Sequence, residues 1–475
     1  MKDGVEAPHE EGASAGAKDA DLARRMAEAA GRDSGLRRFL VGRLLARPWF
    51  DRATLFALKH MFFPASRLLA AADEARGDTV IFKQAVPLMD TAVPYARLDR
   101  LLARVEQARA AAAAVEARWE AVFFGGAAAL ESERVALEAA RIAARHHFNS
   151  LRWTLRAALP FKVPAARLAL ETPQAVAARL DPLLAEGRLP CDAPDSVVVT
   201  RSQSVMTAAG LDYWLRFASP GIGDIVTARV HEPIGVVDPP TIIFGHGVCV
   251  DFDHWMGLID ESVGLVAHGF RVIRPEAPWH GRRTPRGFFA GERTVATFPA
   301  GICDSMRAAV SEWTVLARWA RQHSHGMLAF GGSSLGAMTA QLAAPHARPD
   351  ALFLVTHTAD MTAVALDGDL SALWADPKAY MAIGWTPELA RRTLSLLDAP
   401  AVCPVPPHHV VSVIGRRDRV LPYRSGRDQL QSWQVPAANI FEWDRGHFTV
   451  PATMIRNRAP LLRLAAIMAP GGPGA

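Results

Sequence analysis

Apolar and polar positions follow two different patterns along this chain, and the change comes near residue 190. Before it, apolar residues recur at three- and four-residue spacing, as at Leu98, Leu102 and Val105, which is the period of an amphipathic helix. After it, short apolar runs alternate with helical stretches, which is typical of a parallel sheet covered by helices. The pattern predicts an all-α region over residues 21–190 and an α/β domain over residues 191–468.

The apolar runs of the second region predict a sheet with two kinds of strand. Three runs joined by short turns predict an antiparallel meander, at residues 196–200, 211–217 and 225–230. Six further runs, separated by helical stretches, predict parallel strands at residues 241–244, 271–273, 327–330, 351–355, 410–414 and 439–443. The predicted fold class is therefore α/β, with a mostly parallel sheet and flanking helices.

Three segments stand outside this alternation. Residues 359–403 interrupt it and contain Tyr380 and Trp385, which predicts a helical insertion or lid. Residues 1–20 are rich in Gly, Ala and charge, and residues 469–475 are rich in Pro and Gly. Segments of such composition bury too little apolar surface to fold, so we expect both to be disordered tails.

The most informative motif follows the third of the parallel runs. The sequence Gly332-Ser333-Ser334-Leu335-Gly336 fits G-x-S-x-G, the turn that presents a nucleophilic serine between a strand and a helix. Side chains two residues before and after the serine would clash with the neighbouring strand and helix, so both places need glycine. Ser334 meets this condition and Ser333 does not, because Leu335 is too large. Ser334 is the predicted nucleophile; a strand-to-helix turn in a catalytically dead fold is the alternative.

A serine nucleophile needs a base and an acid that orients the base. In this architecture they follow in the order Ser, Asp, His along the chain. Asp418 lies in the loop after the fifth parallel run, and His447 lies in the loop after the last one. We predict a Ser334-His447-Asp418 triad, in which His447 takes the serine proton and Asp418 fixes its tautomer. Asp360, after the fourth parallel run, is the alternative acid.

Backbone N–H groups are the expected stabilisers of the oxyanion. Ile243-Phe244-Gly245-His246-Gly247-Val248 ends another apolar run in a Gly-rich turn. We predict that the N–H of Val248 and the N–H of Leu335, just after the nucleophile, form the oxyanion hole. His246 is expected to pack this turn rather than to take part in catalysis.

Composition limits the remaining chemistry. The chain has 475 residues, half of them apolar, and a net charge of +5 with acidic residues interspersed, which does not predict nucleic-acid binding. Its four cysteines are far apart and form no CxxC pair, which argues against a zinc site or a disulfide framework. We expect neither a metal nor a cofactor. The polar N-terminus lacks an apolar signal core and no long uncharged apolar run occurs, which favours a cytoplasmic protein.

From about residue 195 to 467 the chain resembles an α/β-hydrolase. The resemblance is carried by His246-Gly247, the G-x-S-x-G turn, Asp418 and Gly446-His447. GHGVCVDFDHW at 245–255, EAPWHGRRTP at 276–285 and the late Asp/His pair also resemble the divergent α/β-hydrolase-domain-18-like branch, which carries a helical segment before its core. The resemblance implies the fold of that superfamily.

Residues 276–285 follow a predicted strand at the rim of the sheet, where pockets form. Arg282 and Arg283 suit an anionic substrate group such as a carboxylate or phosphate. The alternative is that they cap carbonyls or pair with nearby glutamates. His280 and His357 are candidates for lining the substrate pocket, with a hydrogen-bonded structural role as the alternative.

Residues 35–70 are basic and interleaved with aromatic and aliphatic side chains. A helix of this kind can lie on an anionic membrane surface. The alternative is that its apolar side packs on the same protein while the arginines form a solvated rim. Peripheral membrane association is therefore a second expectation for localisation.

Together these features favour a serine esterase that forms an acyl-enzyme, with a small-molecule ester as its partner. Apolar side chains in residues 359–400 favour a hydrophobic or lipid-like ester. Two alternatives stay open. The same triad can transfer the acyl group to an acceptor other than water, or the fold can serve as a non-catalytic binding protein.

Overall fold

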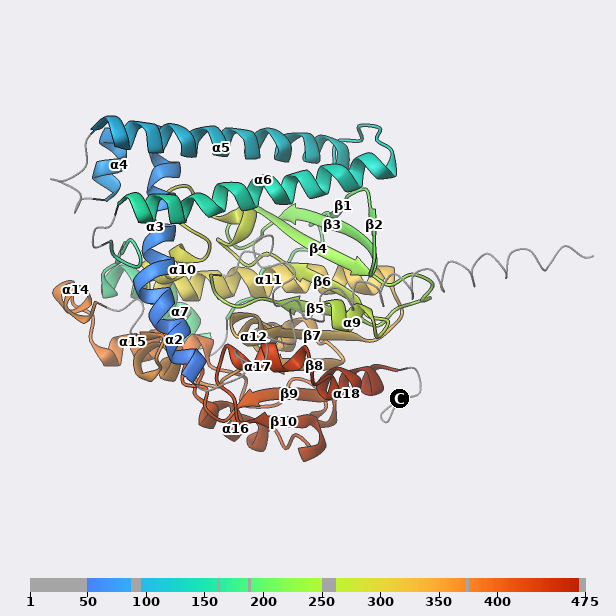
Figure 1. Cartoon of the computed structure of the whole chain (residues 1–475). Coiled ribbons are helices and arrows are strands. Elements are labelled where there is room, and N and C mark those ends of the chain that lie inside the picture. The colour runs from blue at the N-terminus through green and yellow to red at the C-terminus, as the bar shows by residue number, and fades with distance from the viewer. Residues whose placement is uncertain are drawn as a thin grey trace, which may run out of the picture.

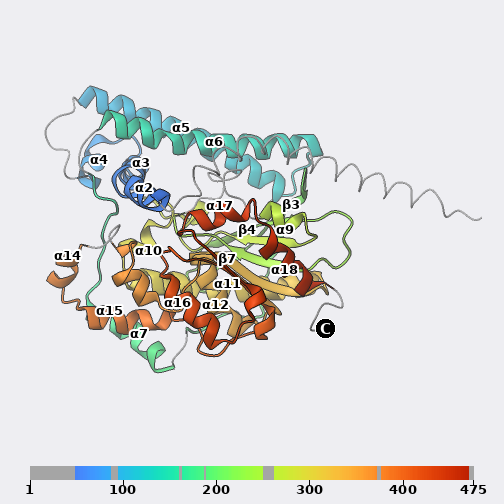
Figure 2. The same cartoon turned by 60° about the horizontal axis from the view of Figure 1, so that its bottom comes forward.

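The computed structural model describes residues 49–86, 95–159, 163–186, 189–249, 262–371 and 376–469. In these residues a layer of helices lies across one side of an α/β domain, whose ten-stranded sheet carries helices on both faces (Figures 1 and 2). The predicted fold class is confirmed. The tail predicted for residues 1–20 lies outside the described residues, as does nearly all of the tail predicted for residues 469–475.

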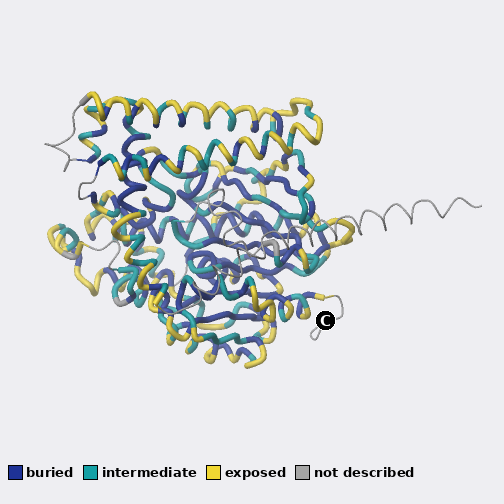
Figure 3. Tube along the Cα trace, viewed as in Figure 1, coloured by how far each residue is buried: buried dark blue, intermediate teal, exposed yellow. Residues whose placement is uncertain are grey.

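In its described residues, the regular elements of the first region are all helices. Its elements are α2 (Trp49–Ala57), the π-helix η1 (Leu58–Phe62), α3 (Phe63–Ala75), α4 (Thr79–Ala85), α5 (Tyr95–Phe123), α6 (Glu131–Ala158) and α7 (Pro173–Glu186). The long helices α5 and α6 lie side by side at the top of Figure 1, and the solvent side of α5 is largely exposed (Figure 3). Helix α3 is buried beneath them through an apolar cluster that includes Leu68, Leu102 and Leu155.

The sheet has an antiparallel part and a parallel part. Its strands are β1 (Thr200–Arg201), β2 (Val205–Thr207), β3 (Gly210–Ala218), β4 (Ile225–Glu232), β5 (Thr241–Gly245), β6 (Arg271–Pro275), β7 (Leu328–Ser333), β8 (Ala351–Val355), β9 (Val410–Gly415) and β10 (Ile440–Trp443). The order across the sheet is β1-β3-β4-β6-β5-β7-β8-β9-β10, with β2 paired to β3. Strands β1 to β4 pair antiparallel, β4 pairs antiparallel with β6, and β5 to β10 are parallel.

One predicted strand is wrong in its extent. Of residues 196–200, only Thr200 enters β1, and Val198 is 78% exposed. The run Val197-Val198-Val199 has the β-branched composition of a strand. It has no strand to pair with, because β1 is an edge strand and pairs only at Thr200 and Arg201, although Val197 and Val199 pack partly against the core.

Two apolar cores form on the two faces of the sheet. Alternate residues of a strand point to opposite faces, so Phe330 of β7 joins one core and Ala329 joins the other. The first core is covered by α11 (Ala300–His323), α12 (Leu335–Ala347) and α15 (Pro387–Leu394). The second is covered by α9 (Ser262–Val266), α17 (Thr449–Met454) and α18 (Ala459–Met468). The strands between them are buried on both sides (Figure 3).

The remaining elements connect the strands. They are η3 (Gly281–Arg283), α10 (Glu292–Ala296), η4 (Ala363–Asp367), α14 (Pro377–Ala382), η5 (Ser395–Leu397), η6 (Pro407–His409), α16 (Tyr423–Ser432) and η7 (Ala437–Asn439). Helices α14 and α15 and the turn η4 lie between β8 and β9, in the segment predicted as an insertion or lid. None of the helices in the described part of the chain combines the length and apolar character needed to cross a bilayer.

Because β5 to β10 are parallel, their carboxyl ends meet at one edge of the sheet. The loops after β5, β7, β9 and β10 therefore emerge at that edge. These loops carry the residues predicted for the oxyanion hole, the nucleophile, the acid and the base.

Candidate active site

A single residue forms the turn between β7 and α12. Strand β7 ends at Ser333 and α12 begins at Leu335, which leaves Ser334 between them with φ 56° and ψ −116°. A non-glycine residue adopts such angles only where the surrounding structure imposes them. The N–H of Ser334 donates to the carbonyl of Val355 at the end of β8 (3.0 Å), and Ser334 lines a cavity.

The glycines of the turn are required by close backbone packing. A Cβ on Gly332 would overlap the backbone of Gly336, and a Cβ on Gly336 would overlap the backbone of Gly245 at the end of β5. The N–H of Gly336 also donates to the carbonyl of His246 (2.9 Å). The turn at Ser334 is therefore in direct contact with the loop after β5.

The two amides predicted for the oxyanion hole flank the same space. Val248 and Leu335 both line the cavity beside Ser334. Leu335 is the first residue of α12, and the first N–H groups of a helix have no intrahelical partner. The N-terminus of this helix also carries a partial positive charge, which favours an anion next to Ser334.

Two buried histidines hold the loop after β5. His246 accepts from the N–H of Ala277 through Nε2 (3.1 Å) and donates to the Gly247 carbonyl through Nδ1 (2.7 Å). His280 accepts from the N–H of Cys249 through Nε2 (3.0 Å). Burial keeps the pKa of His246 well below its ordinary value, so the ring is neutral. His280 was predicted as a substrate-pocket residue; the structure instead uses both of its ring nitrogens internally, the second on the Pro278 carbonyl (2.8 Å).

The predicted acid and base are joined. Nδ1 of His447 lies 2.8 Å from Oδ2 of Asp418, and both side chains are buried. The other carboxylate oxygen of Asp418 accepts from the N–H groups of Val420 and Leu421, each at 2.9 Å. Burial lowers the pKa of His447, but the charge and hydrogen bond of Asp418, together with the charge of Asp51, outweigh it, so the net pKa lies above the ordinary value. Such a ring is an effective base that carries its proton on Nδ1.

The alternative acid has another contact. Oδ1 of Asp360 accepts from the N–H of Ala363 (3.1 Å), the first residue of the π-helix η4.

Among the described residues, Ser334 and His447 are not hydrogen-bonded to each other. Catalytic hydrogen bonds are often long in unliganded sites and shorten when substrate binds.

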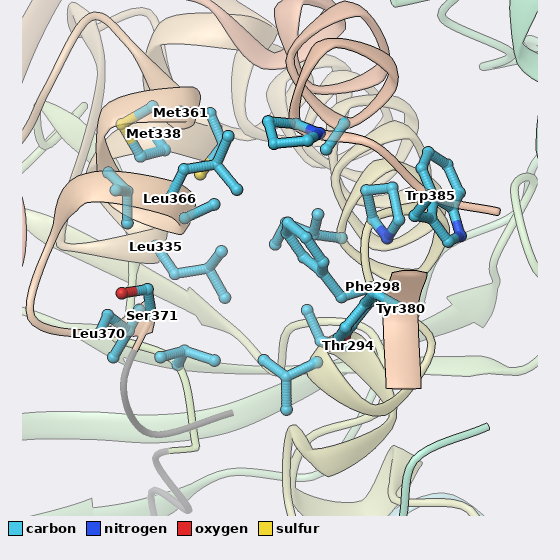
Figure 4. Close-up of a pocket in the computed structure, with 18 of the residues that line it drawn as sticks. Thr294, Phe298, Leu335, Met338, Met361, Leu366, Leu370, Ser371, Tyr380 and Trp385 are labelled. Atoms are coloured by element: carbon cyan, nitrogen blue, oxygen red, sulfur yellow. The ribbon is translucent and has the colours of Figure 1, made fainter. Parts of the chain in front are cut away.

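The cavity beside Ser334 is almost wholly apolar and has a volume of about 250 Å³. Most of its wall comes from three parts of the chain (Figure 4). The predicted insertion supplies Met361, Leu366 and Trp385, α12 supplies Met338, and the segment from α10 to α11 supplies Phe298. Sequence analysis missed this last segment, because nothing in its composition separates a cavity wall from an ordinary core.

The arginines predicted to hold a substrate anion are occupied by protein carboxylates. Arg283 is buried and bonds to Asp224 and Glu312 (shortest distances 2.7 and 2.6 Å). Arg282 bonds to Glu116 of α5 (2.8 Å) and to Glu276 (3.1 Å). At Arg283 these contacts contradict the predicted anion site. At Arg282, which ties α5 to the loop after β6 and also lines a second cavity, the anion site stays a prediction.

The prediction for His357 is also corrected. Its ring is buried between Ser412 (2.9 Å) and Gln429 (3.1 Å), and it is not part of the cavity wall beside Ser334. Burial lowers its pKa to about 4, so it is neutral near pH 7. It connects the end of β8 to β9 and α16.

The structure describes only part of residues 35–70, the segment for which membrane association is predicted. Residues 35–48 lie outside the described residues. From Phe63 to Ala70 the segment is buried in the protein, as the packing alternative required, whereas Trp49, Phe56 and Met61 are exposed. Membrane association stays a prediction.

Comparison with known proteins gives distant likenesses only. No model of a protein family matches the chain, and no curated protein matches it. Among solved structures, an acetyl xylan esterase from Thermoanaerobacterium has 14% identity over 63% of this chain and 95% of its own, with a TM-score of 0.41. An S-formylglutathione hydrolase from Agrobacterium tumefaciens has 15% identity over 57% and 99%, with a TM-score of 0.38. A cold-adapted esterase from an Arctic intertidal metagenomic library has 13% identity over 55% and 96%, with a TM-score of 0.37.

The chain's own features decide the fold. It has a mostly parallel sheet with helices on both faces, a serine turn between β7 and α12, and Ser334, Asp418 and His447 in that order after β7, β9 and β10. This is the arrangement of the nucleophile-elbow enzymes. The relation to the domain-18-like branch stays a prediction, and the chain is an α/β-hydrolase by fold.

Proposed function

We propose that this protein is a serine hydrolase that cleaves carboxylic esters with a hydrophobic acyl or alcohol part. The observation that carries the proposal is the position of Ser334, in a strained turn at the N-terminus of α12 and at the wall of an apolar cavity. Backbone strain at a serine is maintained where it serves presentation of the hydroxyl.

In the proposed reaction, His447 Nε2 takes the proton of the Ser334 hydroxyl as Oγ attacks the ester carbonyl. The carbonyl π pair moves onto oxygen, and the N–H groups of Val248 and Leu335 bind the resulting oxyanion. One such donor is typically worth about 10²–10³ in rate. His447 then gives its proton to the alcohol oxygen as the C–O bond breaks, which leaves the acyl group on Ser334.

Water completes the cycle. His447 removes a proton from a water molecule, whose oxygen attacks the acyl carbon, and the proton returns to Ser334 as the acid leaves. Asp418 keeps the Nδ1 proton of His447 in place and stabilises the imidazolium formed in both steps.

The cavity wall supports the substrate class. Burial of apolar surface stabilises binding by about 25 cal/mol per Å², so an apolar wall favours aliphatic or aromatic chains over sugars. Acyl transfer to an alcohol or thiol is the second candidate function. An apolar cavity wall favours it, because water is the acceptor that competes with the alcohol or thiol.

A fluorophosphonate probe tests the proposal directly, because it labels only an activated serine. We expect rapid labelling of the wild type and none of Ser334→Ala or His447→Ala. Ser333→Ala is the matched control, since it removes the neighbouring hydroxyl of the same turn and should label like the wild type. A series of 4-nitrophenyl esters from acetate to dodecanoate then gives the chain-length preference.

Absence of labelling in folded wild type, together with no turnover of any ester, would reject the hydrolase and favour a non-catalytic binding protein. Faster product release on addition of alcohols or thiols would favour acyl transfer over hydrolysis.

A further inference from the structure

One carboxylate from the helical region reaches the loop that carries His447. Asp51 lies in the first turn of α2, and its side chain is buried, whereas its neighbour Arg52 is exposed. In both cartoons the end of α2 that carries Asp51 lies beside the C-terminal elements near α17 (Figures 1 and 2). Nothing in the local sequence distinguishes Asp51 from a solvated helix residue.

The carboxylate of Asp51 packs directly against the backbone of the His447 loop. A Cβ on Gly446 would overlap the carboxylate of Asp51, so the carboxylate occupies the space that a side chain at position 446 would need. The backbone N–H groups of His447 and Phe448 are close enough to lower the pKa of this carboxylate, while its Oδ1 is buried without a hydrogen-bond partner among the described residues. Glycine at position 446 is therefore explained by a residue nearly the whole chain away.

We propose that Asp51 is a positioning residue of the active site, which holds the His447 loop in place from the helical region and thereby makes catalysis depend on that region. The inference rests on the function proposed above, in that it assigns His447 as the base.

The mechanical part of the argument concerns the freedom of the loop. His447 is held at its ring by Asp418, and Gly446 is held by the hydroxyl of Thr449 (2.9 Å). Both contacts come from the C-terminal part of the chain, and glycine at 446 leaves the backbone flexible. Asp51 adds a third contact from the helical region, at the backbone of Gly446 and close to the N–H groups of His447 and Phe448. A displacement of about 1 Å at a catalytic group can cost about 10²-fold in rate.

The electrostatic part concerns the charge of His447. The charged groups that face Asp51 are His447 and Asp418, from the loops after β10 and β9. Burial raises the pKa of Asp51 to about 6, against the lowering effect of His447, so the carboxylate is ionised at pH 8. There it adds to Asp418 in stabilising the imidazolium, because a nearby negative charge raises the pKa of a base.

The experiment compares the wild type with Asp51→Asn and Asp51→Ala, with Arg52→Gln as the matched control on the exposed side of the same turn. The probe is 4-nitrophenyl butyrate. We expect kcat at pH 8 to fall about 10- to 100-fold in Asp51→Ala and less in Asp51→Asn, with KM unchanged, because Asp51 is not part of the cavity wall. In Asp51→Asn the acid limb of the kcat/KM profile moves to lower pH. Arg52→Gln should match the wild type.

A second measurement does not depend on activity. Hydrogen–deuterium exchange of the peptide spanning residues 444–450 should be faster in Asp51→Ala, which removes the side chain, and unchanged in Arg52→Gln. An unmoved acid limb with kcat within twofold of the wild type in both variants would overturn the inference, as would unchanged exchange in this peptide. If the wild type neither hydrolyses esters nor labels, the proposed function fails, and the exchange data alone decide whether Asp51 holds the loop.

Discussion

The α/β domain and the helical layer are attached to their surroundings by different kinds of contact. In the domain, strands such as Ala351–Val355 and Val410–Gly415 are buried along their whole length between two apolar cores. In the helical layer, an apolar cluster between α5 and the first strands is joined by ion pairs that cross to the domain: a buried one, Arg67 with Glu292 (2.8 Å), and a partly buried one, Arg282 with Glu116 (2.8 Å). Apolar burial is non-directional, whereas ion pairs need defined geometry.

This difference bears on function. The domain carries the predicted chemistry in its loops, and its apolar cores keep those loops together. The layer contributes one carboxylate, Asp51, to the catalytic edge, and a contact of that kind works only if α2 and α3 are fixed in register. The ion pair of Arg67 with Glu292 fixes the position of α3, the helix next to α2, relative to the domain. If the proposed function holds, the layer is a positioned part of the active site and not merely a cover.

The largest effect is expected inside the domain, at the acid. Asp418→Asn keeps the shape of the side chain but stops it from stabilising the imidazolium and fixing the tautomer of His447. We expect kcat on 4-nitrophenyl butyrate to fall about 10⁴-fold with little change in KM. Asp360→Asn is the control and should change kcat by less than threefold, because Asp360 bonds to the N–H of Ala363 and not to His447. A loss of kcat in Asp360→Asn as large as that in Asp418→Asn would contradict the assignment of Asp418 as the acid of the triad.

The next effect tests the attachment of the layer. Arg67→Met leaves the buried Glu292 carboxylate without its counter-charge and should lower the free energy of unfolding by about 3–5 kcal/mol. The double variant Arg67→Met/Glu292→Gln removes both charges and should regain most of the loss, while its glutamine oxygen can still accept from the N–H of Arg167. Urea unfolding measures both. A loss below about 1 kcal/mol in the single variant would show that the pair does not hold the layer.

A smaller effect tests the cavity. Ala365 lines it, so Ala365→Phe should fill part of the space and lower kcat/KM for 4-nitrophenyl decanoate about 10-fold or more relative to acetate, since each excluded methylene is worth about 1 kcal/mol. Ala382→Phe is the matched control, because Ala382 is exposed on α14 of the same insertion. An unchanged acetate-to-decanoate ratio in Ala365→Phe would place the acyl chain elsewhere.

The sequence predicted the domain better than the layer, for physical reasons. Strands buried on both faces leave continuous apolar runs, and the turn at Ser334 needs glycines at fixed spacing, so both are visible in a short window of sequence. The prediction of an anion site at Arg283 was wrong because its partners Asp224 and Glu312 are far away along the chain. Asp51 escaped notice for the same reason. A charge reveals its role only through its partner, and the fold alone chooses that partner.

The smallest effect separates positioning from stability at Asp51. Because burial raises its pKa from 3.8 to about 6, the folded protein binds the proton more tightly than the unfolded chain. The stability that this protonation contributes is full below pH 3.8 and is lost as the pH rises through about 6. Asp51→Asn mimics the protonated acid, so at pH 8 it should raise the free energy of unfolding by on the order of 1 kcal/mol once screening by nearby solvent is allowed for.

Melting temperatures of the wild type and Asp51→Asn at pH 5 and pH 8 measure this difference, and the gain should shrink at pH 5. Lower kcat with equal or higher stability would mean that the layer keeps a buried charge at the catalytic edge at a cost to its own stability, as active sites do when a charge serves the reaction. A lower melting temperature at pH 8 in Asp51→Asn would contradict this expectation and make Asp51 a stabilising contact of the same kind as Arg67 with Glu292.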